Sequence, residues 1–217
     1  MKLLMVGATG LVGQAVLLAV RQRPDIASIG LLSRKPVPNA PEQSTLFLVD
    51  DFSAETLQQL DLRGFDACVY CAGILPLGVS QDTYREATVG MTLRVATAYA
   101  AANPAGRFVY VSGAGADPRS RSMPFRIKGE AEDALNQLPV SCVCVRPGIV
   151  RPMDGCTSPH AVRRWAYRLA DPLLRVGSAV VPNLFTRSDA LGAVLLNLAT
   201  MAQPPAVVEN SMLEGLA

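Results

Sequence analysis

The first two thirds of the chain alternate short apolar runs with longer segments of helical periodicity. The apolar runs predict β-strands, over residues 3–6, 28–32, 46–49, 66–70, 107–111 and 141–145. The segments between them predict helices, over residues 11–21, 81–102 and 125–138, together with a short helix that Ser53 begins as N-cap. Because the strands are apolar on both faces and helices separate them, we expect an α/β fold: a doubly wound parallel sheet of the Rossmann type.

The pattern changes after Arg146. Prolines and glycines predict loops over residues 147–159, a basic amphipathic stretch follows over 160–175, and a helix is predicted over 186–200, with Ser188 and Asp189 near its start. A length of 217 residues suits a single domain. We therefore expect one domain, with a core of residues 1–150 and a small C-terminal extension of residues 151–217.

Charge and cysteine usage exclude several classes of function. The net charge of +2 predicts neither a nucleic-acid surface nor a membrane-surface patch, and no segment has the apolar length of a membrane span. Cys68 and Cys71, three apart on a strand, point to opposite faces, while Cys142 and Cys144 share one face as core residues. We therefore expect no metal site and no disulfide, and a reducing, cytoplasmic location.

The most specific motif is a glycine-rich turn directly after the first predicted strand. Gly7 permits the tight turn, Gly10 lets the backbone approach a pyrophosphate, and Gly13 lets helix and strand pack closely. The amides at the start of the following helix supply an anion site. In this context the turn predicts a dinucleotide site rather than an ordinary turn with packing glycines. Its expected cofactor-binding residues are Gly7, Thr9, Gly10, Leu11, Val12 and Gly13.

The second predicted strand ends in Ser33, Arg34 and Lys35. An acidic residue at this place hydrogen-bonds the ribose 2′-hydroxyl of NAD, whereas a hydroxyl, a guanidinium and an ammonium suit a 2′-phosphate. The three residues therefore favour NADP(H) over NAD(H). The alternative interpretation is a solvated basic loop.

These features resemble those of an atypical short-chain dehydrogenase/reductase. The resemblance also rests on three other segments, Asp50-Asp51-Phe52, Cys71-Ala72-Gly73 and Lys128-Gly129-Glu130-Ala131-Glu132. Two more, Val111-Ser112-Gly113-Ala114-Gly115-Ala116-Asp117 and Arg146-Pro147-Gly148, are most similar to the HIV Tat-interacting-protein branch, near the NAD-dependent epimerase/dehydratases. The resemblance covers residues 1–150 well and the last third loosely.

The resemblance implies roles along a bound cofactor. Asp51 and Phe52 would lie by the adenine, and Lys128 would hydrogen-bond the nicotinamide ribose. The other residues that would line the cofactor are Cys71, Ala72 and Gly73 on its ribose side and Pro147, Gly148 and Ile149 beside the nicotinamide. Residues 151–217 would shape the substrate side. The residues alone allow another interpretation, in which Asp51 begins a turn, Lys128 is a solvated helix residue and Arg146 is a surface ion-pair partner.

One position departs from the family. Its reductases carry a tyrosine four residues before the lysine, where it exchanges a proton with the substrate oxygen. Here that position is Pro124, and Phe125 beside it is equally inert. The remaining candidate catalytic residues are Lys128 and Ser112, and related epimerases place the working hydroxyl one or two positions further along, where this chain has glycine and alanine.

Further candidates come from the last third of the chain. His160, the only histidine, is a possible acid or base or simply a structural residue. The basic stretch around Trp165 is a recognition surface for an anionic partner or, as we favour, a solvated amphipathic helix. Two functions stay open: an NADP-dependent oxidoreductase or epimerase-like enzyme for a small carbonyl or alcohol, and a non-catalytic NADP(H)-binding regulator with a protein partner.

Overall fold

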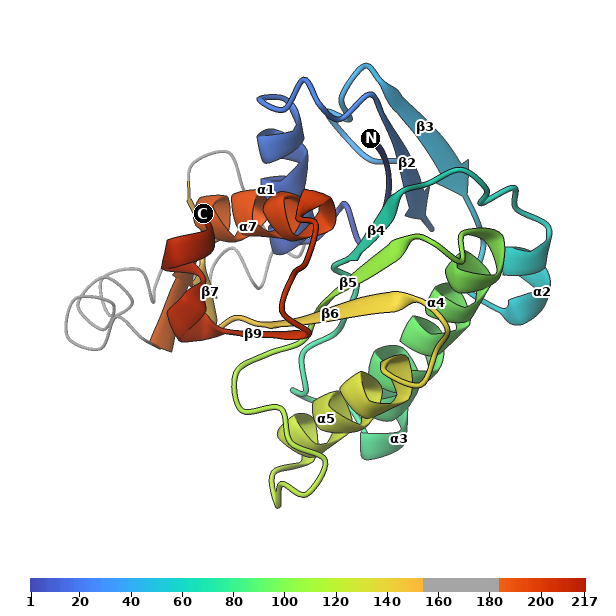
Figure 1. The fold of residues 1–217 in the computed structure, drawn as a ribbon. Helices are drawn as coiled ribbons and strands as arrows, with labels where there is room; N and C mark the ends of the chain where they lie inside the picture. Colours follow the sequence, from blue (N-terminus) through green and yellow to red (C-terminus); the bar gives the residue numbers. More distant parts are fainter. Residues whose placement is uncertain (154–183) are drawn as a thin grey trace.

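A computed structural model describes residues 1–153 and 184–217 of the chain (Figure 1). Its main feature is a seven-stranded parallel sheet with the order β3-β2-β1-β4-β5-β6-β9. The strands are β1 (Lys2–Val6), β2 (Ser28–Ser33), β3 (Ser44–Leu48), β4 (Ala67–Tyr70), β5 (Arg107–Val111), β6 (Ser141–Arg146) and β9 (Val207–Glu209). This order, with helices between the strands, confirms the predicted doubly wound Rossmann-type fold.

The helices cover both faces of the sheet (Figure 1). One face carries α1 (Leu11–Val20) and α7 (Ser188–Thr200), and the other carries α2, α4 and α5. The remaining bounds are α2 (Ala54–Gln58), α3 (Gln81–Arg85), α4 (Met91–Ala102) and α5 (Met123–Leu135). The predicted N-cap of α2 is confirmed, because the Ser53 hydroxyl accepts a hydrogen bond from the amide of Thr56.

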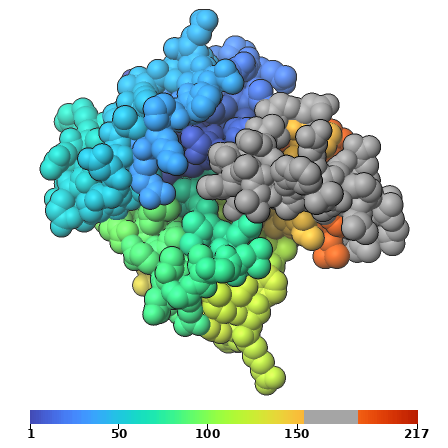
Figure 2. All heavy atoms as spheres, turned by 180° about the vertical axis from the view of Figure 1, so that it is seen from behind, coloured from blue at the N-terminus to red at the C-terminus, as the bar shows by residue number. Residues whose placement is uncertain are grey.

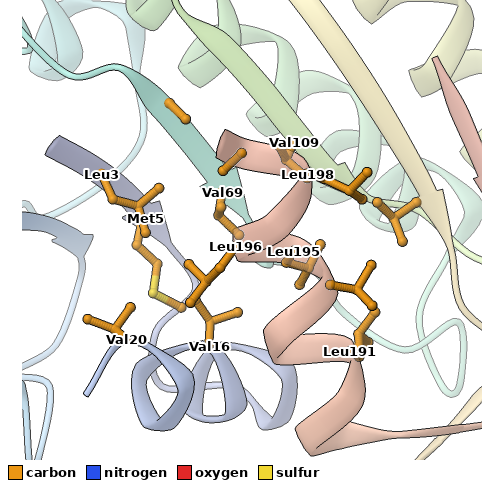
Figure 3. Close-up of a cluster of buried hydrophobic side chains, with 14 of the residues drawn as sticks. Leu3, Met5, Val16, Val20, Val69, Val109, Leu191, Leu195, Leu196 and Leu198 are labelled. Carbon is orange, nitrogen blue, oxygen red and sulfur yellow. The ribbon is translucent and has the colours of Figure 1, made fainter. Parts of the chain in front are cut away.

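Alternating residues of the central strands enter two separate hydrophobic clusters. Leu3 and Met5 of β1 pack beneath α1 and α7, whereas Leu4 and Val6 face the opposite layer. Figure 3 shows Leu195 and Leu196 of α7 among side chains from α1 and from the sheet. Both faces of the central strands are therefore buried, as their apolar runs predict, whereas the edge strand β3 leaves Leu46 and Leu48 exposed.

The four cysteines of the described ranges lie as their strand positions predict. Cys68 belongs to one cluster and Cys71 packs against the other, while Cys142 and Cys144 both face the α4–α5 side. All four are free thiols, and burial raises the pKa of each above its usual value. They act as small hydrophobic residues of the core.

The C-terminal part of the chain differs from the expectation. Thr186 and Arg187 belong to strand β8 (Phe185–Arg187), which pairs with β7 (Ile149–Arg151), so the helix expected from residue 186 begins at Ser188. In addition, α7 and β9 complete the core instead of lying on the substrate side, because α7 packs on α1 and β9 pairs with β6. Two single 3-10 turns, η3 (Asn210–Met212) and η4 (Glu214–Leu216), end the chain.

The long helix expected over residues 81–102 is continuous but not uniform. Between α3 and α4 it contains a π-helical turn, η1 (Glu86–Gly90). Within the described ranges, no helix has the length and apolar character needed to cross a membrane.

Candidate cofactor and active site

The predicted cofactor residues follow the carboxyl ends of neighbouring parallel strands. Gly7 follows β1, Cys71 follows β4, Ser112 follows β5 and Pro147 follows β6, while Ser33 ends β2. Because the strands are parallel, these positions share one edge of the sheet. The strand order reverses between β1 and β4, and open α/β sheets bind ligands at such a point. Figure 2 shows the blue N-terminal segment between lighter blue and green parts of the chain.

The glycine-rich turn is sterically tight. Gly7 has a φ of +87°, and a Cβ atom there would overlap the backbone of Ala72 at the end of β4. A Cβ atom on Gly13 would overlap the carbonyl oxygen of Gly7. On Gly10, by contrast, a Cβ atom would meet only the Gly7 oxygen, at 3.3 Å, among the described residues. Two glycines therefore permit the close packing, and the third leaves room beside the backbone.

The amino-terminal end of α1 is open to an anion. Its N-cap, Gly10, has no side chain to bond the first amides, and the first turn contains no acidic residue. Thr9 contributes its carbonyl oxygen, which accepts a hydrogen bond from the Gln14 side chain at 3.0 Å. The positive end of the helix dipole thus faces the edge of the sheet without a compensating charge from α1.

Arg34 and Phe52 come together beyond the end of β2. The Arg34 guanidinium lies 5.8 Å from the centroid of the Phe52 ring, within the range of a cation–π contact. Arg34 and Lys35 are exposed, whereas the hydroxyl of Ser33 is engaged by the backbone of Lys35, donating to its oxygen at 2.8 Å. Two cationic side chains are thus available at this position, and the serine shapes the turn that carries them.

Asp51 shapes the neighbouring turn. Its carboxylate accepts hydrogen bonds from the Ser53 amide at 2.9 Å and the Thr56 hydroxyl at 2.8 Å, and these bonds lower its pKa. Beside it lies a surface hollow of about 460 Å³, whose lining is Asp51, Phe52, Ser53, Ala54, Glu55 and Arg94. Arg94 is a residue that sequence reasoning missed: it donates to the Phe52 carbonyl at 2.8 Å from α4, 42 positions away.

Lys128 lies across the sheet edge from Arg34, beside the end of β5. Its ammonium donates to the carbonyl oxygen of Ser112 at 2.5 Å, across from α5 to the end of β5. A Cβ atom on Gly113 would overlap the same ammonium, so glycine there makes room for it. Burial lowers the pKa of Lys128 to about 8, against an opposing effect of Glu132. The structure thus joins Lys128 and Ser112, the two candidate catalytic residues.

The buried ammonium makes a prediction for stability against pH. The unfolded lysine titrates near 10.5 and the folded one near 8, so the cost of the buried charge is fully present below pH 8 and is relieved as the pH rises to 10.5. We expect Lys128→Met to stabilise the protein relative to wild type at pH 7, and this advantage to shrink at pH 10. Urea unfolding of both proteins at the two pH values measures it; an equal difference at both would contradict the lowered pKa.

The proton-donating part of the site is not assembled in the described residues. Pro124 lies in the first turn of α5, and Phe125 packs toward Gly115 with 43% of its surface exposed. The Ser112 hydroxyl is buried and has no hydrogen-bond partner within the part of the chain that the structure describes. The tyrosines of the described ranges, Tyr70, Tyr84, Tyr99 and Tyr110, are all buried in the core, which raises the pKa of each.

Arg146 has a structural role. It forms an ion pair with Glu132 of α5, of which 4% is exposed, and a second with Glu209 of β9 at 2.7 Å. These bonds raise the pKa of Arg146. They join β6, α5 and β9 directly before the turn of Pro147 and Gly148, so Arg146 is more than the surface ion-pair partner that the residues alone suggest.

Several sequence candidates lie outside the described residues. These are His160, Trp165 and the arginines of the basic stretch.

Comparisons with known proteins agree with this architecture. The model of the NAD dependent epimerase/dehydratase family matches residues 3–137. The Leucinostatins biosynthesis cluster protein T of Purpureocillium lilacinum is 36% identical over 135 residues, which are 60% of this chain and 49% of that protein. The mitochondrial protein fmp52 of Aspergillus clavatus is 28% identical over 155 residues, 67% of this chain and 65% of its own. The chain therefore spans 49% of the first relative's length and 65% of the second's.

Solved structures share the fold. MoeE5 in complex with UDP-glucose and NAD superposes with a TM-score of 0.69 at 17% identity, covering 96% of this chain and 75% of that one. The glucuronic acid dehydrogenase of Chromohalobacter salexigens gives a TM-score of 0.71 at 14% identity, covering 100% of this chain and 83% of that one. At these identities the likeness concerns the arrangement of the sheet and helices.

Proposed function

The chain belongs to the NAD dependent epimerase/dehydratase family, and on that premise we propose that it is an NADP(H)-binding oxidoreductase-like protein for a small carbonyl or alcohol. The observation that carries the proposal is the pair of features at one sheet edge: the tight glycine turn and the exposed Arg34 over Phe52. The turn suits a pyrophosphate, and Arg34 suits the 2′-phosphate that distinguishes NADP from NAD.

The geometry supports a cofactor lying across the carboxyl edge. Its adenosine half would lie beside Arg34, Lys35 and the hollow next to Asp51, and its pyrophosphate above the amides of α1. The nicotinamide half would reach Lys128, whose ammonium has hydrogen-bonding capacity beyond the Ser112 carbonyl, since an ammonium carries three donors. When bound, the nicotinamide supplies or accepts the hydride.

The residues of this chain supply positioning for that reaction. Lys128, already held by the Ser112 carbonyl, would orient the nicotinamide ribose, and because burial lowers its pKa to about 8 its nitrogen can exchange a proton near that pH. The loop after β4 exposes Ile74, Leu75 and Leu77 beside the cofactor residues Ala72 and Gly73. An apolar surface at this place favours a substrate with an alkyl or aryl group next to its oxygen.

A second function is favoured by a specific observation. Pro124 occupies the position of the family's acid, and the described tyrosines are buried in the core. A non-catalytic regulator, whose contacts with a protein partner depend on bound NADP(H), needs the cofactor site and not the acid. This second proposal predicts binding without turnover.

Two measurements on the purified chain separate these functions. Calorimetry measures NADPH binding, and loss of NADPH absorbance reports turnover with a panel of aldehydes and ketones that includes alkyl and aryl members. We expect NADPH to bind, and an oxidoreductase to reduce at least one carbonyl of the panel. Tight binding with no reduction would favour the regulator, whereas absence of NADPH binding would contradict both proposals.

A further inference from the structure

The turn of Pro147 and Gly148 joins β6 to β7, where the nicotinamide half of the cofactor is proposed to lie. Its backbone is held from two sides. The Pro147 carbonyl accepts a hydrogen bond from the amide of Ala114, in the loop after β5, at 2.9 Å. The Gly148 amide donates to the side-chain oxygen of Asn210 at 2.7 Å and to the hydroxyl of Thr186 at 3.1 Å.

Asn210 is placed by the pairing of β9 with β6. Arg146 lies in register with Glu209 and forms an ion pair with it. The residues that follow them, Pro147 and Asn210, therefore lie at the same position along the two paired strands. The Asn210 side-chain oxygen also accepts a hydrogen bond from the Thr186 hydroxyl, while its nitrogen donates to the Phe185 carbonyl at 3.4 Å. One amide side chain thus links the turn, strand β8 and the end of β9.

The turn also packs closely against the segment before β8. A Cβ atom on Gly148 would overlap the Leu184 carbonyl, so the backbone of the turn already touches the segment before β8. Thr186 is 5% exposed, whereas Ile149, the residue after the turn, is 51% exposed. The buried side of the turn is therefore fixed by polar contacts, and the side that faces outward is apolar.

We propose that Asn210 is a positioning residue that holds the backbone of Pro147–Ile149 for the nicotinamide half of the cofactor. The proposal rests on the proposed function, because it requires that half to lie at the turn. Asn210 lies beyond the residues that the family model matches, and it acts through Gly148 rather than on the cofactor. The adenosine half, beyond β1 and β2, should not depend on it.

The test compares two ligands that share the adenosine half. NADPH carries both halves, whereas adenosine 2′,5′-bisphosphate carries the adenosine, its 2′-phosphate and the 5′-phosphate only. Asn210→Leu keeps the size of the side chain but removes the closer of the two oxygens that accept a hydrogen bond from the Gly148 amide. An unmade hydrogen bond in a buried site weakens affinity by about 5- to 30-fold. We expect that loss for NADPH and no measurable change for the bisphosphate, both by calorimetry on the full chain.

Three further variants keep the proposal falsifiable. Asn210→Asp retains the accepting oxygen and should restore most of the NADPH affinity, and Thr186→Val should give a smaller loss that is again confined to NADPH. Asn197→Leu removes a different asparagine, which binds the Leu216 carbonyl, and should leave both affinities unchanged. Equal losses for both ligands, or no loss in Asn210→Leu, would overturn the positioning role. Failure of the wild type to bind either ligand would instead refute the proposed function.

Discussion

Replacing Arg34 by alanine is expected to weaken NADPH binding by about 10- to 100-fold, which corresponds to the ~1.5–3 kcal/mol of a charged hydrogen bond. NADH binding should change by less than about threefold, because NADH has no 2′-phosphate for the guanidinium to contact. The exposed side chain over Phe52 is the cation placed for this contact, with Lys35 next to it. Calorimetric titration of both nucleotides into wild type and variant measures the two losses.

Two controls separate the contact from a general effect of charge. Arg34→Lys keeps the positive charge but loses the planar fork that binds a phosphate through two donors, so it should recover part of the affinity. Arg63→Ala removes another exposed arginine, which pairs with Asp61 just before β4, and should affect neither nucleotide. Equal losses of NADPH and NADH in Arg34→Ala would refute the assignment of the 2′-phosphate to Arg34.

The core of the fold was accessible to sequence reasoning because its signals are local. Each predicted strand of the first two thirds appears, since apolar runs buried on both faces are typical of central parallel strands. The bounds shift where pairing overrides polarity: β3 begins at Ser44, which pairs with Ile29, two positions before its first large apolar residue. The helix after Ser122 likewise begins at Met123, because Pro124 suits a first helical turn.

The misplaced elements are short or depend on partners far along the chain. Strands β7, β8 and β9 have three residues each, too few for a periodic pattern, and their pairing brings together residues more than 30 positions apart. Thr186 reads as the start of a helix because Ser188 and Asp189 follow it, but its pairing with Val150 makes it part of a strand. The π turn at Glu86–Gly90 also leaves no periodic signal within a helix that otherwise continues.

The residues of the candidate site also fall into those that the sequence predicts and those that it does not. The glycine turn and the strand ends are contiguous motifs, and the structure brings them to one edge. Asn210 and Arg94 were missed, because a single asparagine or arginine carries no motif and each binds backbone more than 40 positions away. Only the tertiary structure brings such residues into contact with the site.

Pro124→Tyr is expected to raise the rate of NADPH-dependent carbonyl reduction by at least about 100-fold, the usual contribution of a positioned proton donor. Residues four apart on a helix lie on the same face, so the new hydroxyl would lie one turn before Lys128. The ammonium nearby lowers the pKa of such a phenol. The substitution removes no backbone hydrogen bond, because the first turn of α5 has no carbonyl to offer an amide at that position.

The measurement is kcat/KM for the carbonyl panel with wild type, Pro124→Tyr and Pro124→Phe. Phenylalanine has nearly the volume of tyrosine but no proton to give, so it should stay at the wild-type rate, while all three proteins bind NADPH with similar affinity. Reduction by the tyrosine variant should also decline at high pH, as the phenol that donates the proton ionises. Equal rates for tyrosine and phenylalanine would show that the cofactor and substrate do not meet beside α5. A gain confined to tyrosine would show that Pro124 alone separates binding from catalysis in this chain.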